Sequence, residues 1–173
     1  MTDAMDLLRD LFGRAHEAVP GLVAHLSADE LLWRPDREAN SVAWLVWHLS
    51  RVQDSHLTEV AGDGAQQVWT SQGWADRFGL PYDEAATGFG QTAEEVGAFV
   101  LEHPGLLTGY HAAVHVLTES VLDDLDETAL DRVVDRRWDP PVTLAVRLAS
   151  VAEDVAQHAG QAAYLRGLVE RRR

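Results

Sequence analysis

The sequence contains no cysteine among its 173 residues. This absence excludes disulfide bonds, zinc sites built on thiolates and cysteine nucleophiles. A metal site in this chain must therefore be built from histidine and carboxylate side chains. Any chemistry that needs a thiol must take that thiol from a small molecule.

Basic side chains are also scarce, with 14 Lys and Arg against 28 Asp and Glu, which gives a net charge of -14. A surface this negative repels the phosphates of nucleic acids and of anionic membranes, so neither is an expected partner. Long apolar runs are missing, and the N-terminus lacks the basic and apolar segments of a signal peptide. We expect a cytoplasmic protein whose partner is a small-molecule substrate.

Alternating strand patterns are missing as well, and apolar residues recur at helical spacing along most of the chain. The pattern predicts one all-α domain over residues 1–173, a four-helix bundle with short extra helices. The long helices are expected at 3–26, 41–61 after a cap at Asn40 or Ser41, 104–124 and 142–171. The sequence TAEE at 92–95 predicts a further helix start. Residues 63–91, with Trp69 and Trp74 among glycines, predict a long aromatic-rich loop that forms a lid or pocket wall.

Asp154 and His158 lie one helical turn apart in ASVAEDVAQHAGQAAYLRG, residues 149–167, with Gln161 following on the same side. They lie beside the apolar stripe of the last helix. Residues four apart point the same way, so both side chains can reach one ion. The same spacing is typical of an Asp–His hydrogen bond that faces solvent, and spacing alone favours that interpretation.

His48 lies on an apolar helix face in VAWLVWHLSRV. A lone histidine in this position is typical of a hydrogen-bonded core residue, but with Asp154 and His158 it would supply a third ligand from a second helix. Two histidines and one carboxylate leave positions for water or substrate. Zn(II) is the first expectation for this divalent metal, and Ni(II) or Fe(II) also fit. His56 is either a neighbour of the site or exposed.

His111 and His115, in YHAAVH, form a competing pair at one-turn spacing on a mixed helix face. The pair is interpreted either as part of a half-exposed surface or as pocket-lining groups that shuttle protons or contact substrate. His16 has no partner at ligand spacing and is expected at the surface. Arg147 and Arg166 flank the Asp154–His158 motif, where they either meet a substrate anion or form surface ion pairs.

Two segments, SVAWLVWHLSRV and DVAQHAGQAAYLRGL, resemble the histidine motifs of the DinB/YfiT-like metalloprotein superfamily. QVWTSQGWADRFGLP and RRWDPPVTLAVRL resemble an actinobacterial branch, and the resemblance covers nearly the whole chain. It implies a four-helix bundle whose divalent metal is held, by position, by His48, Asp154 and His158. Asp154 departs from the His-x-x-x-His of many members, but the related mycothiol-dependent maleylpyruvate isomerase also uses a carboxylate there.

The resemblance also implies activities that depend on mycothiol or bacillithiol, metal-dependent hydrolysis, and compatibility with a homodimer. We expect a metal-dependent transferase that joins a low-molecular-weight thiol, mycothiol, to a small electrophile. A metal that lowers the pKa of the thiol would supply the nucleophile that the cysteine-free chain lacks. His111 or His115 would then be an acid–base or binding group. Two alternatives stay open: a metal-dependent hydrolase, and a non-catalytic metal- or small-molecule-binding stress protein.

Overall fold

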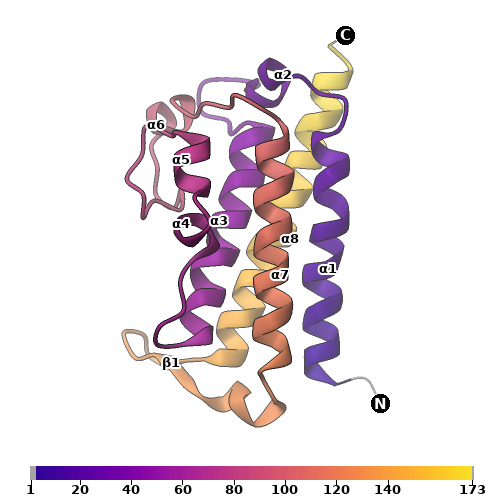
Figure 1. Cartoon of the computed structure of the whole chain (residues 1–173). Helices are drawn as coiled ribbons and strands as arrows, with labels where there is room; N and C mark the ends of the chain where they lie inside the picture. Colours follow the sequence, from indigo (N-terminus) through magenta and orange to yellow (C-terminus); the bar gives the residue numbers. More distant parts are fainter. Residues whose placement is uncertain (1–2, 173) are drawn as a thin grey trace.

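The computed structural model describes residues 3–172, and four long helices packed side by side form most of it (Figure 1). These helices are α1 (Ala4–Val23), α3 (Val42–Ala61), α7 (Gly105–Asp123) and α8 (Leu144–Glu170). Helices α1 and α8 run in one direction and α3 and α7 in the other (Figure 1). Both α1 and α3 pack against α7 and α8, and the predicted all-α four-helix bundle is confirmed.

Short polar side chains set where the long helices begin. Asp3 starts α1 within a capping box, and Thr143 accepts a hydrogen bond from the N–H of Val146 at the start of α8. Of the two caps predicted for α3, Ser41 is the one used, through the N–H of Trp44. The first helix ends at Val23, three residues short of the predicted boundary.

Residues 63–91 are predicted as one long aromatic-rich loop, and the structure adds two short helices to it. This segment contains α4 (Val68–Ser71) and α5 (Trp74–Phe78), and the rings of Trp69, Trp74 and Phe78 are buried against Tyr110 of α7. Aromatic rings remove a large apolar area from water when they are buried, so these three extend the core. The next helix, α6 (Ala93–Gly97), has the capping box that the TAEE sequence predicts.

A buried ion pair on α3 holds the 63–91 segment in place. The Asp54 carboxylate accepts hydrogen bonds from the N–H groups of Val68 (2.9 Å) and Trp69 (2.8 Å). Arg51 lies 3.7 Å from Asp54 and donates to the carbonyl of Ala86 (3.1 Å). Both charged side chains are fully buried. Because breaking such a buried pair is strongly destabilising, the network ties both ends of the segment to α3.

The remaining elements are small. Helix α2 (Ala28–Leu32) follows α1, and a 3-10 helix covers Glu127–Asp131. Two short strands, β1 (Val133–Asp135) and β2 (Val142–Thr143), pair antiparallel just before α8. Within residues 3–172, none of the helices has the length and apolarity that crossing a membrane requires.

Candidate metal centre

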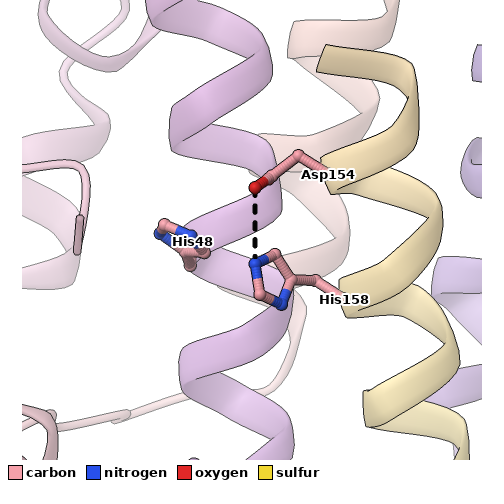
Figure 2. Close-up of side chains that lie close together, drawn as sticks. All are labelled: His48, Asp154 and His158. Atoms are coloured by element: carbon pink, nitrogen blue, oxygen red, sulfur yellow. Dashed lines mark ion pairs between the residues drawn. The ribbon is translucent and has the colours of Figure 1, made fainter. Parts of the chain in front are cut away.

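Three side chains meet where α3 and α8 face each other. His48 comes from the middle of α3, and Asp154 and His158 come from consecutive turns of α8 (Figure 2). One ligand atom from each residue lies within 4.8 Å of the other two. The two imidazole rings meet edge to face, with centroids 4.7 Å apart. The structure thus brings together the three residues predicted to hold a metal.

The orientation of His48 is set by a backbone carbonyl. Its Nδ1 lies 2.6 Å from the carbonyl oxygen of Thr87, at the end of the 63–91 segment. A carbonyl only accepts hydrogen bonds, so Nδ1 carries the proton and Nε2 keeps its lone pair. Burial lowers the pKa of His48, which favours the neutral ring that metals bind.

His158 and Asp154 hold each other within the site. The Nε2 atom of His158 lies 3.5 Å from Asp154 Oδ1, and its Nδ1 lies 2.9 Å from the side-chain oxygen of Gln161. The hydrogen bond to Asp154 raises the pKa of His158. Burial acts to raise the pKa of Asp154, but the hydrogen bond and charge of His158 outweigh it and lower that pKa. Binding of a metal by His158 Nε2 would require this nitrogen to be free of its proton.

The chemistry of the three donors fits a divalent metal. Asp154 Oδ2 is buried and has no hydrogen-bond partner among residues 3–172. An unpaired buried carboxylate oxygen costs free energy, and a cation would remove that cost. Two imidazole nitrogens and one carboxylate oxygen form a ligand set that suits Zn(II), Fe(II) and Ni(II).

Gly88 allows the 63–91 segment to approach His48 closely. A Cβ atom at this position would lie 2.8 Å from His48 Nδ1 and 2.8 Å from a ring carbon of Trp44. The backbone of Gly88 also has a φ of +93°, which favours glycine. Any larger residue would push Thr87 away from His48 or displace the ring.

A cavity of about 220 Å³ opens beside His48 and Asp154, and His158 is not among its lining residues. Its lining includes His48 and Asp154, the apolar side chains of Val52, Val151 and Phe89, and the polar residues Ser55, His56, Arg147 and Ser150. A second cavity, of about 600 Å³, lies next to it and shares Arg147, with Glu59, Arg136 and Arg137 in its wall. A small molecule can therefore reach the candidate ligands.

The structure places His111 and His115 away from this cavity, whose lining contains neither of them. His111 is buried on α7 with Nδ1 3.0 Å from the hydroxyl of Ser50, and His115 stacks on His16 with ring centroids 4.0 Å apart. His16, expected at the surface, is half-buried in this cluster of three histidines. An acid–base or substrate role for His111 and His115 stays a prediction.

Trp69, Trp74 and Trp138 are also absent from the lining of the small cavity. Trp69 and Trp74 are buried in the core, and Trp138 is 67% exposed. The residues of the 63–91 segment that do form the wall are Thr87 and Phe89, next to Gly88. The only sequence signal for them is the run TGFG at 87–90, whose two glycines indicate an unusual backbone.

The four-helix bundle defines the class of this protein as a helical bundle of the DinB/YfiT-like type, and two histidines and a carboxylate from facing helices form its candidate metal site. Residues 7–171 match the family model described as mycothiol-S-transferase, and the chain belongs to that family. A solved structure, the conserved protein of a locus from Enterococcus faecalis, has a TM-score of 0.89 and 35% sequence identity over 98% of both chains. No curated protein matches the chain.

Replacing a ligand should remove the metal. We expect His158→Ala to lower affinity for Zn(II) by at least about 100-fold, because only one histidine and one carboxylate would remain. Metal retained after dialysis, measured by elemental analysis, checks this result. His103→Ala, which removes an exposed histidine outside the site, should retain as much metal as the wild type. Equal retention by His158→Ala would show that this residue is not a ligand.

Substituting Gly88 should damage the site through the backbone. We expect Gly88→Ala to lower the free energy of unfolding by about 1–3 kcal/mol and to weaken metal binding, because the new Cβ would contact His48. Gly90→Ala is the matched control, since Gly90 also has a positive φ but open space around it. Thermal unfolding and metal titration of both variants distinguish the steric effect of the new Cβ atom on His48 from the strain of a positive φ. Equal effects on metal binding would contradict the role of Gly88.

The histidine cluster should make stability fall in acid. Burial lowers the pKa of His111 to about 3, and burial also lowers the pKa of His115. Unfolded histidines bind protons near pH 6.5, so the stabilising contribution is complete above that pH and is lost as pH falls toward 3. We expect His111→Gln to reduce the loss of stability between about pH 7 and pH 5. Urea unfolding at both values measures it, and an unchanged loss would contradict the assignment.

Proposed function

We propose that this protein transfers a low-molecular-weight thiol, mycothiol, to a small electrophile with the help of a divalent metal at His48, Asp154 and His158. The observation that carries the proposal is the match of residues 7–171 to the mycothiol-S-transferase family. The site supports it, since the candidate ligands lie beside a cavity that a small molecule can enter.

The residues around the cavity give the reaction a place to occur. A bound divalent metal would supply Lewis acidity that lowers the pKa of a thiol. Thr87 and Gln161 hold the two imidazoles so that each Nε2 faces the centre of the site. Val52, Val151 and Phe89 form an apolar wall that suits the body of a small electrophile.

The adjoining cavity suits the rest of the thiol. At about 600 Å³ it is larger, and its lining is rich in charged groups, including Glu59, Asp63 and Arg136. Such side chains can hydrogen-bond the hydroxyl groups of a sugar-containing thiol. In the reaction, the thiol sulfur forms a bond to the electrophilic carbon, its proton passes to solvent, and any leaving group departs.

A thiol-dependence assay tests the proposal. We expect the Zn(II)-loaded protein to accelerate conjugation of mycothiol to 1-chloro-2,4-dinitrobenzene, measured by product absorbance after subtraction of the uncatalysed rate. His158→Ala should reduce the acceleration by at least about 100-fold, because the metal that lowers the pKa of the thiol would be lost. His103→Ala should leave it unchanged.

Reactions without mycothiol, or with another thiol in its place, distinguish a transferase from a hydrolase and from a non-catalytic binding protein. Omission of mycothiol should abolish consumption of the electrophile, and replacement by a thiol without a sugar should weaken it. Consumption that continues without any thiol would indicate a hydrolase. If a broad panel of electrophiles gave no acceleration with mycothiol, the transferase proposal would be wrong, and a non-catalytic binding protein would be favoured.

A further inference from the structure

Arg147 links the two cavities. It lies in the first two turns of α8, seven residues before Asp154, so both side chains project from the same face of the helix. Its side chain is only 18% exposed, and it lines both the cavity beside the candidate metal ligands and the adjoining larger one. The guanidinium group is therefore part of the space in which a substrate would bind.

The hydrogen-bonding capacity of Arg147 is largely unused. Among residues 3–172 its one hydrogen bond runs from Nη2 to Asp135 Oδ2 at 3.3 Å, and its Nε is buried without a partner. Asp135 is held more closely by Arg137, through the backbone N–H (2.9 Å), Nε (3.0 Å) and Nη2 (2.8 Å). Because Arg137 already neutralises the charge of Asp135, the positive charge of Arg147 is not fully paired, and its Nε–H group remains available to a ligand.

The charges around the smaller cavity favour an anion at Arg147. The carboxylate in its lining is Asp154, whose charge a divalent cation would more than balance. Arg147 itself is largely buried beside the apolar side chain of Val151, and partial burial strengthens the interaction of a guanidinium with a carboxylate. The chain as a whole has a net charge of -14, which repels anions, so a local cation is needed to retain one.

By contrast, the guanidinium group of Arg166, the other arginine that flanks the Asp154–His158 motif, is already hydrogen-bonded to groups outside the site. Its Nη1 donates to the carbonyls of Leu22 and Ala24, and its Nη2 pairs with Glu170. It contributes to neither of the two cavities described above. Of the two arginines, only Arg147 is available to a molecule in the site.

We propose that Arg147 binds a carboxylate of the electrophilic substrate, and that the protein therefore prefers small electrophiles with an apolar body and one acidic group. The description of this ligand as the electrophile rests on the proposed function, whereas its recognition by Arg147 rests on the cavity alone. A planar guanidinium binds a carboxylate through two parallel hydrogen bonds, which gives both affinity and orientation. Arg147 would hold the acidic end while the reactive carbon faces the candidate metal ligands.

Binding of a matched ligand pair tests this proposal without any turnover. The pair is 4-chloro-3-nitrobenzoate and 4-chloro-3-nitrobenzamide, which share a ring and differ in charge. Isothermal titration without thiol should show that the Zn(II)-loaded wild type binds the benzoate about tenfold more tightly than the amide, because a charge-assisted hydrogen bond is lost in the amide. Arg147→Gln and Arg147→Met should lower this ratio to about one, and Arg147→Lys should keep part of it.

Arg37→Gln is the matched control, because it removes the same formal charge from an exposed residue that lines neither of the two cavities. It should keep the wild-type ratio. Asp135 retains Arg137 in every Arg147 variant, so the strand region should stay folded, which thermal unfolding verifies.

Two results would overturn the proposal. The first is a wild type that binds benzoate and amide equally. The second is a preference for benzoate that survives in Arg147→Gln. If that remaining preference disappears when the metal is removed, the metal binds the carboxylate. Because no thiol is present, either of these two results counts against the role of Arg147 alone, and failure of the thiol-dependence assay counts against the transferase function alone.

Discussion

The candidate site depends on one hydrogen bond, between Nδ1 of His48 and the carbonyl oxygen of Thr87. This contact selects the tautomer of His48 and turns its Nε2 toward α8, where Asp154 and His158 lie. It exists only because the 63–91 segment returns to α3 after folding two short helices, and because Gly88 leaves room for the approach. The buried pair Arg51–Asp54 holds that segment, so the site and the packing beside α3 form one cooperative unit.

A second constraint is the balance of charge at the site. Asp154 is half-buried, and among residues 3–172 its Oδ2 has no partner, while His158 Nε2 lies 3.5 Å from its Oδ1. Burial alone would disfavour the carboxylate, so the site needs a positive charge, either a proton on His158 or a bound cation. A cation can also interact with a thiol, which matches the proposed use of a thiol from solution by a chain that has no cysteine.

The sequence predicts much of the fold, because helical periodicity, caps such as Ser41, and the spacing of Asp154 and His158 are local signals. The convergence of His48 with that pair follows from apolar faces that must pack together. Thr87 was not found, since a backbone carbonyl has no side-chain signature and its role arises from tertiary contact. For the aromatic residues of 63–91 the sequence predicts a lid or pocket wall, because it gives their apolar character but not their partner, which is Tyr110.

The two groups of histidines show why residue type and spacing are insufficient to identify a metal site. His48 faces α8, whereas Ser50, two residues later, faces α7 and contacts His111. On that side His16 and His115 stack nearly parallel, with 11° between their rings, so their in-plane lone pairs do not converge on one point. At the other site the rings of His48 and His158 meet at 73° and a carboxylate lies between α3 and α8. The two pairs have the same helical spacing, and the neighbouring helix decides how they differ. His111 and His115 lie against a further histidine, His16 of α1. Asp154 and His158 lie against His48 of α3, whose Nδ1 is already hydrogen-bonded.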